Sequence, residues 1–209
     1  MTLYDITIPI SSELAVWPGD TSYKFDLGMA IRRGDSVNVG AVTMSVHTGT
    51  HVDAPFHFDD TAPGIDALPL DPYIGFAVVV DVRGLHSIGP EVWEGIDFAR
   101  TPRVLLKTDS WSNYRVFPEA IPTLTEESAA YLAAQGALLF GIDVPSVDAI
   151  DSKTLPIHHT LNSANIRILE SVDLRAVPPG IYELIALPLT FSGADGSPVR
   201  AILRTLPVE

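Results

Sequence analysis

The sequence has 209 residues, of which 46% are hydrophobic and 19% are charged, with a net charge of −13 and no cysteine. This composition is typical of a globular protein with a buried core and excludes a disordered chain, while the acidity opposes binding to nucleic acid or to an anionic membrane. Without cysteine there are no disulfides, thiolate nucleophiles or cysteine zinc sites, so any metal must be held by histidine, aspartate and glutamate.

The first ten residues lack the basic and apolar regions of a signal peptide. The longest apolar run, residues 74–82, is far shorter than the roughly 20 residues that span a bilayer. We therefore expect a cytoplasmic protein that forms a single domain over residues 1–209.

Eight segments rich in β-branched and aromatic residues predict strands. In chain order they are 3–10, 23–31, 37–46, 75–82, 103–108, 137–142, 182–187 and 199–205. The segments at 75–82, 103–108 and 137–142 are continuously apolar, which is typical of strands buried on both faces.

Helices are fewer. Residues 124–136 have a threonine cap, two glutamates in the first turn and Gly136 at the end, a pattern that predicts a helix. A short helix is expected around 89–95, and another from about Asn162 to Val172. The sequence thus predicts an α/β domain that is rich in strands.

The stretch 46-VHTGTHVDAPFHF-58 holds three of the six histidines, His47, His51 and His57, together with Asp53. A helix is disfavoured here by the β-branched residues, by Gly49 and by the proline at 55. A fully extended strand would spread the four side chains over roughly 33 Å, too far for one site. We therefore expect a loop that folds back and brings imidazoles and a carboxylate together on a metal.

The alternative is that these are separate surface or core histidines. A second polar cluster favours the metal site: 157-IHHTLNSANIRILE-170 contributes His158, His159 and Glu170. The apolar neighbours of Glu170 indicate that its carboxylate is buried, and a buried carboxylate is costly without a partner such as a metal. Taken alone, Glu170 would also fit an exposed position on a helix.

These residues carry a resemblance to a known family. The segment HTGTHVDAPFHF resembles the H-x-G-T-H-x-D-x-P-x-H-F signature of the metal-dependent cyclase-like hydrolases. Four further segments are similar to the bacterial kynurenine formamidases of that family. They are VWPGD (16–20), GIDVPSVD (141–148), HHTLNSANIRILES (158–171) and YELIALPLTFSGADGSPVRAILR (182–204).

The resemblance implies a swivelling β/β/α fold, a homodimer and two divalent metal ions per subunit, zinc in the first place with manganese as the alternative. His47, His51 and Asp53 would bind the first ion. Asp53 would bridge to a second ion held by one histidine of the 158/159 pair, and Glu170 would contact both. His57 would transfer protons, and Trp17 would line the substrate pocket.

Geometry does not choose within the histidine pair. On one continuous helix His159 and Glu170 would lie about 16 Å apart, so the histidine is expected on a loop before the helix. The resemblance then assigns His158 as the ligand and His159 as its neighbour.

The implied reaction is hydrolysis of N-formyl-L-kynurenine to L-kynurenine and formate, a step of tryptophan breakdown, by metal-activated water. Two alternatives stay open: a sister amide or lactam hydrolase such as an isatin hydrolase, and a non-catalytic metal-binding protein on the same fold. A serine hydrolase is disfavoured because the sequence has no G-x-S-x-G motif. Packing or surface roles are expected for Trp93, Trp111, Arg32, Arg33 and His86.

Overall fold

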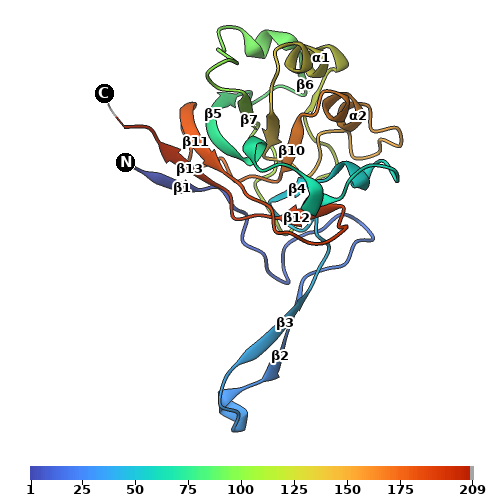
Figure 1. Cartoon of the computed structure of the whole chain (residues 1–209), viewed down its shortest axis with the longest axis vertical. Coiled ribbons are helices and arrows are strands. Elements are labelled where there is room, and N and C mark those ends of the chain that lie inside the picture. The colour runs from blue at the N-terminus through green and yellow to red at the C-terminus, as the bar shows by residue number, and fades with distance from the viewer. Residues whose placement is uncertain (208–209) are drawn as a thin grey trace.

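The computed structural model describes residues 1–207, and its centre is a nine-stranded mixed sheet in the order β1-β13-β11-β5-β7-β9-β10-β4-β12 (Figure 1). The four central strands β5, β7, β9 and β10 are parallel, and the flanking strands are antiparallel. The strands are β1 (Leu3–Asp5), β4 (His51–Asp53), β5 (Ile74–Asp81), β7 (Arg103–Lys107), β9 (Leu139–Ile142), β10 (Arg167–Glu170), β11 (Gly180–Ile185), β12 (Gly196–Pro198) and β13 (Ile202–Thr205).

The sheet has an apolar cluster on each face, because successive side chains of a strand point to opposite sides. In β7, Val104 and Leu106 join the cluster beneath the helices α1 (Glu126–Ala134) and α2 (Pro156–Ser163), whereas Leu105 joins the cluster on the other face. The sheet curls around this second cluster. The predicted α/β fold class, rich in strands and poor in helices, is confirmed.

The three apolar segments differ in burial. Every residue of β7 and β9 is buried, as predicted for strands covered on both faces. For β5 the prediction is wrong: Ala77 and Val79 are buried, whereas Ile74 and Phe76 are 40% and 43% exposed. The apolar run in β5 therefore does not mean burial on both sides, and it leaves an apolar patch on the outer surface.

The predicted helix at 124–136 is confirmed as α1. The side chain of Thr125 accepts a hydrogen bond from the Ser128 backbone N–H at 3.1 Å, and Gly136 adopts a left-handed φ of +72° just after the helix. These are the expected start and stop signals. The segment at 89–95 forms the 3₁₀ helix η5 (Pro90–Trp93) instead of an α-helix.

The prediction of a helix at 162–172 is wrong. Helix α2 begins at Pro156 and ends at Ser163, Asn165 takes a left-handed φ of +58°, and the chain continues as β10. The β-branched residues Ile166 and Ile168 suit a buried strand, and β10 pairs in parallel with β9. As a result Glu170 lies on a strand, and His158 lies in the first turn of α2 instead of on a loop before a helix.

Within residues 1–207, the strands β2 (Lys24–Met29) and β3 (Val39–Thr43) pair only with each other, and they form a hairpin that projects from the body (Figure 1). We call residues 24–43 the arm. Its tip is the 3₁₀ helix η1 (Ile31–Arg33). The remaining short elements are η2 (Pro55–His57), η3 (Ile65–Ala67), η4 (Asp71–Tyr73), β6 (Ser87–Ile88) and β8 (Thr123–Leu124). Within residues 1–207, none of the helices is long and apolar enough to cross a membrane.

Candidate metal centre and active site

The centre of the site is the pairing of β4 with β10. His51 and Asp53 are two residues apart on β4, so they point to the same face, while Val52 between them enters the core. Glu170 on β10 is the cross-strand partner of His51. The Nε2 atom of His51 lies 3.4 Å from Asp53 Oδ1 and 3.4 Å from Glu170 Oε2. Strand register alone therefore places an imidazole and two carboxylates together.

His47 reaches the same point from the loop before β4. Gly49, with a left-handed φ of +69°, lets this loop turn, and a Cβ there would come within 3.2 Å of Ile10. Gly196 on β12 leaves room for the His47 ring, since a Cβ would lie 3.0 Å from its Cε1. The His47 Nδ1 atom then lies 3.0 Å from Asp53 Oδ1. The expected folding back of this segment is thus observed.

His158 enters from α2, where Asp148 holds it in place. The Asp148 carboxylate accepts the backbone N–H groups of Ile157 and His158, both at 3.0 Å, and it lies 2.7 Å from His158 Nδ1. One aspartate therefore both caps the helix and orients the ring. The other ring nitrogen, Nε2, lies 3.6 Å from Asp53 Oδ2 and 3.6 Å from Glu170 Oε1.

The four contacts that His51 and His158 make with Asp53 and Glu170, at 3.4–3.6 Å, have the spacing of shared metal ligands and not of hydrogen bonds, whereas His47 Nδ1 lies closer to Asp53, at 3.0 Å. Two ligands about 2.0–2.2 Å from one tetrahedral ion lie roughly 3.3–3.6 Å apart, close to the separations found here. Both Asp53 carboxylate oxygens and His51 Nε2 are buried, with no hydrogen-bond partner among the described residues. Buried polar atoms are rarely left unpaired, so their convergence fits a cation. Two groups of possible ligands share Asp53: His47, His51 and Asp53, and Asp53, His158 and Glu170.

Each of the three inner imidazoles also has its second nitrogen fixed by an oxygen. His51 Nδ1 lies 2.8 Å from the Gly49 carbonyl, His47 Nε2 lies 3.0 Å from Asp195 Oδ2, and His158 Nδ1 faces Asp148. Metal-binding histidines commonly donate their other N–H to such an acceptor, which fixes the tautomer and the ring orientation. The arrangement leaves one nitrogen of each ring free toward the carboxylates.

The electrostatics follow from this crowding. Burial alone would lower the pKa of His51, but the Asp53 and Glu170 carboxylates raise it to about 10. Burial would likewise lower the pKa of His158, yet Asp148 and Asp53 raise it to about 10. Burial would raise the pKa of Asp53, but the surrounding imidazoles hold it well below its usual range. The buried carboxylates thus stabilise positive charge at this point, whether it comes from protonated imidazoles or from metal ions. Metal binding would release the protons from the imidazoles.

His57 differs from the inner histidines. It ends η2 beside them, its ring 4.0 Å from that of His47 between centroids, and 35% of its side chain is exposed. Burial lowers the pKa of its imidazole, although the nearby Asp53 carboxylate opposes this shift. His57 lines the same cavity as the inner histidines and belongs to neither ligand group around Asp53, but with His47 and Asp195 it forms a third group of possible ligands.

The cavity encloses about 310 Å³ above the carboxylates, and three aromatic residues line it: Trp17, Trp111 and Phe117. The Trp17 and Phe117 rings meet edge to face at 5.2 Å. Trp17 begins a turn in which the Asp20 N–H donates to its carbonyl, with Gly19 at a φ of +97°. The 16-VWPGD-20 segment therefore presents an indole at the cavity.

All seven residues singled out from the sequence, Trp17, His47, His51, Asp53, His57, His158 and Glu170, line this cavity or reach its base. His159 is exposed and packs against Phe58 instead. Sequence reasoning did not find Asp148, Asp195 or Phe117, and it treated Trp111 as a packing or interface residue. Trp93 is buried, with its indole N–H donated to Ser128, and Arg32 and His86 are exposed, as expected.

Comparisons with known proteins agree with this geometry. Residues 4–149 match the family model described as "Putative cyclase". The kynurenine formamidase of Bacillus cytotoxicus is 47% identical over 97% of both chains. Among solved structures, a predicted metal-dependent hydrolase from Bacillus stearothermophilus is 29% identical with a TM-score of 0.76, covering 97% of both chains. Isatin hydrolase A from Labrenzia aggregata is 26% identical with a TM-score of 0.80, covering 97% of this chain and 93% of that one.

The curled sheet and the buried His/Asp/Glu cluster define a metal-dependent hydrolase of the cyclase type. The chain belongs to this cyclase family and, at 47% identity over nearly its full length, to its kynurenine formamidase branch.

Proposed function

We propose that the protein hydrolyses N-formyl-L-kynurenine to L-kynurenine and formate, using two divalent metal ions per chain, most simply zinc. The observation that carries this proposal is the convergence of three anchored imidazoles on the unpaired oxygens of Asp53, at the base of an aromatic-lined cavity. The choice of substrate rests on the relatives named kynurenine formamidase.

His47, His51 and Asp53 would hold the first ion, and Asp53, His158 and Glu170 the second. When bound, such ions polarise a carbonyl oxygen and make water nucleophilic at neutral pH. Glu170 is aligned for both ions, because Oε2 faces His51 and Oε1 faces His158. Its Oε1 also accepts the Val147 backbone N–H at 2.9 Å, which fixes the carboxylate plane.

The other residues position the substrate and move the proton. Trp17, Trp111 and Phe117 offer faces and edges for the aryl ring. As the carbon–oxygen bond to water forms and the carbon–nitrogen bond breaks, His57 takes a proton from water and delivers it to the aniline nitrogen. Formyl is the smallest acyl group, so a close-fitting cavity would favour it over acetyl.

The direct test is a side-by-side assay of N-formylkynurenine and isatin with zinc-loaded protein. Isatin is the appropriate competitor because the fold matches isatin hydrolase A with a TM-score of 0.80. We expect a kcat/KM for formylkynurenine at least 10²-fold above that for isatin. Equal or reversed kcat/KM values would indicate that the substrate is a lactam. Absence of both activities would indicate a non-catalytic metal-binding protein.

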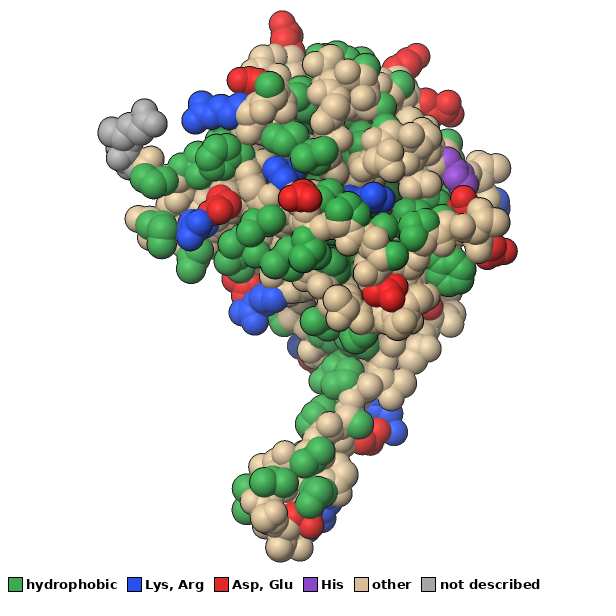
Figure 2. All heavy atoms as spheres, viewed as in Figure 1, with side chains coloured by type: hydrophobic (Ala, Val, Ile, Leu, Met, Phe, Trp, Pro, Cys, Tyr) green, Lys and Arg blue, Asp and Glu red, His purple; other side chains and the backbone are tan. Residues whose placement is uncertain are grey.

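We also propose that two copies associate. An isolated two-stranded hairpin is only marginally stable in water, yet the arm pairs only with itself within the described residues. Large apolar side chains are exposed along both of its strands and at its tip (Figure 2): Phe25, Met29, Ile31, Val37, Val39 and Val42. Light scattering should give a molar mass of twice the chain mass for the wild type. The double variant with Val39→Asp and Val42→Asp should have the mass of one chain. A monomeric wild type would refute the dimer.

A further inference from the structure

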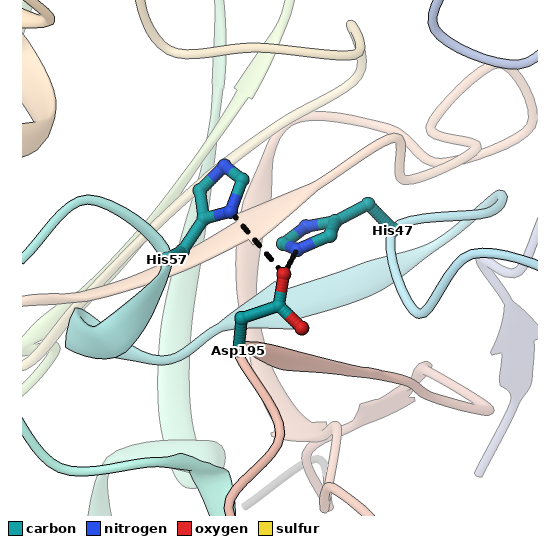
Figure 3. A group of neighbouring side chains, drawn as sticks. All are labelled: His47, His57 and Asp195. Atoms are coloured by element: carbon teal, nitrogen blue, oxygen red, sulfur yellow. Dashed lines mark hydrogen bonds and ion pairs between the residues drawn. The ribbon is translucent and has the colours of Figure 1, made fainter. Parts of the chain in front are cut away.

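Asp195 joins two histidines that have different tasks. It lies in the loop just before β12, and its Oδ2 atom is 3.0 Å from His47 Nε2 and 3.6 Å from His57 Nδ1 (Figure 3). The imidazole rings of His47 and His57 lie side by side above this oxygen, with their centroids 4.0 Å apart. One carboxylate oxygen therefore faces a proposed metal ligand and the proposed proton carrier at once.

We propose that Asp195 is a positioning residue whose Oδ2 atom fixes the rings of both His47 and His57, and so couples the first metal site to the proton-transfer group. The inference rests on the proposed function, because it takes the role of each histidine from there. In this proposal Asp195 acts through the two rings and holds neither the substrate nor an ion.

The contact with His47 sets which nitrogen faces the metal site. Because Nε2 is held by Asp195, Nδ1 is directed at Asp53 Oδ1, 3.0 Å away. His51 and His158 are held in the same way, by a backbone carbonyl and by Asp148. Asp195 thus completes the set of outer acceptors, and loss of such an acceptor typically weakens metal binding 10–100-fold.

The contact with His57 sets which nitrogen is free for proton transfer. With Nδ1 turned toward Asp195, only Nε2 remains to exchange a proton with water and the leaving nitrogen. The 3.6 Å separation exceeds a hydrogen bond, but such contacts are often long before substrate binds and shorten in the complex. About two-fifths of the Asp195 side chain (42%) is exposed, which leaves it room to make this adjustment.

The loop itself does not depend on this carboxylate. The Ala54 N–H donates to the Asp195 carbonyl at 2.9 Å, the Ile65 N–H donates to the Ala194 carbonyl at 2.8 Å, and Gly196 pairs with Asp53 between β12 and β4. These main-chain bonds persist when only the side chain is changed. A substitution at Asp195 should therefore leave the fold intact and act on the two rings.

The first test measures metal binding without turnover. Zinc is titrated into metal-free protein against a chromophoric chelator, for the wild type, Asp195→Ala and Asp195→Asn. We expect one of the two ions to bind 10–100-fold more weakly to Asp195→Ala, and the Asn variant, which keeps an acceptor oxygen, to lie in between. The matched control is Asp66→Ala, since Asp66 bonds to Gly193 of the same loop and touches no histidine; it should bind both ions like the wild type.

The second test measures proton transfer at saturating zinc, with a series of formanilides of increasing aniline basicity. Poor leaving groups need the proton most, so the loss in kcat for Asp195→Ala should grow along the series, and 4-nitrophenyl formate should be nearly unaffected. Asp195→Ala combined with His57→Ala should be little slower than His57→Ala alone. The coupling would be overturned if Asp195→Ala bound zinc as tightly as the wild type. It would also be overturned if Asp195→Ala lowered kcat by the same factor for every formanilide, and if this factor multiplied the loss caused by His57→Ala in the double variant. The zinc titration does not depend on the substrate, so an error in the proposed formamidase activity would show separately, as loss of formanilide hydrolysis in the wild type with the effect of Asp195→Ala on zinc affinity retained.

Discussion

His57 is the one site histidine that stands apart from the buried carboxylates, with an open edge toward the cavity. Because it belongs to neither ligand group around Asp53, His57→Ala should lower turnover roughly 10²–10⁴-fold, the usual contribution of a general acid–base residue. Metal content, measured by elemental analysis, should stay at the wild-type value. Loss of an ion from this variant would show that His57 is a metal ligand.

The neighbouring histidines at 158 and 159 give a second comparison at this scale. His158 is buried between Asp148 and the carboxylates, whereas His159 is exposed beside Phe58. We expect His158→Ala to lose about one metal equivalent and most activity, and His159→Ala to keep both. Metal analysis together with the formamidase assay distinguishes them, and the opposite pattern would exchange their assignments.

Asp143, which is not among the proposed metal ligands, offers a prediction on pH and stability. Burial raises the pKa of its carboxyl to about 6, although Thr108 and Asp109 donate hydrogen bonds to it. A folded-state pKa above the unfolded value means that the native state binds the proton more tightly. This stabilisation is complete below pH ~4 and is lost as the pH rises through about 6.

Asp143→Asn should remove that pH dependence. Since two pKa units correspond to about 2.7 kcal/mol, the variant should gain stability relative to the wild type between pH 4 and pH 7, by up to that amount. Urea unfolding across this range measures the difference. A constant difference at all pH values would show that the pKa of Asp143 is the same in the folded and unfolded chains.

At the residue scale, local sequence information reveals the inner cluster but not its supports. His47, His51 and Asp53 lie within seven residues beside a glycine and a proline, so their composition alone suggests a site. Asp148 and Asp195 lie 10 and 148 residues from the imidazoles that they hold. An isolated aspartate in a loop has no distinguishing pattern, and only the paired strands β4 and β12 bring Asp195 to His47.

Among the elements, α2 depends on the same aspartate that orients its proposed metal ligand, His158. Asp148 accepts the N–H groups of Ile157 and His158 and also holds the His158 ring. Asp148→Ala should therefore lower stability by about 1–2 kcal/mol and also reduce the metal content by about one equivalent. Urea unfolding and elemental analysis measure the two effects.

Helix α1 supplies the matched control for this prediction. Thr125 caps α1 through Ser128, and α1 carries none of the proposed ligands, so Thr125→Ala should lower the free energy of unfolding by about 1 kcal/mol without changing the metal content. If Asp148→Ala behaves like Thr125→Ala and keeps both ions, then Asp148 is only a helix cap.

The elements also show where the sequence pattern misleads. The Thr125 cap and the glycine at 136 are strong local signals, and α1 was predicted correctly. Residues 162–172 mix helix-forming and β-branched residues, and there tertiary pairing decides: Ile168 opposes Phe140 of β9, and Leu169 opposes Val52 of β4. The short strands β4 and β12 were missed because three-residue strands have no measurable alternation.

In the whole molecule, the site draws on segments that lie far apart in the chain. His51 and Glu170 meet only when β4 and β10 pair, and Asp195 arrives with β12 on the other side of β4. The ligand set therefore exists only in the folded chain, and the unfolded chain has no comparable site. Metal binding must consequently stabilise the native state, by about 2.7 kcal/mol per site when the free ion is at 100 times its Kd.

Removing the ions should therefore lower stability as well as activity. At about 2–4 °C per kcal/mol for a chain of this size, loss of one ion held at that saturation should lower the Tm by about 5–10 °C. Prolonged dialysis against a chelator, followed by calorimetry and the formamidase assay, should show both losses, and added zinc should reverse them. The Asp53→Asn variant should begin at the lower Tm and respond little to zinc, because Asp53 belongs to both ligand groups. Full activity or an unchanged Tm in protein shown by elemental analysis to be free of metal would contradict both the site and the proposed reaction.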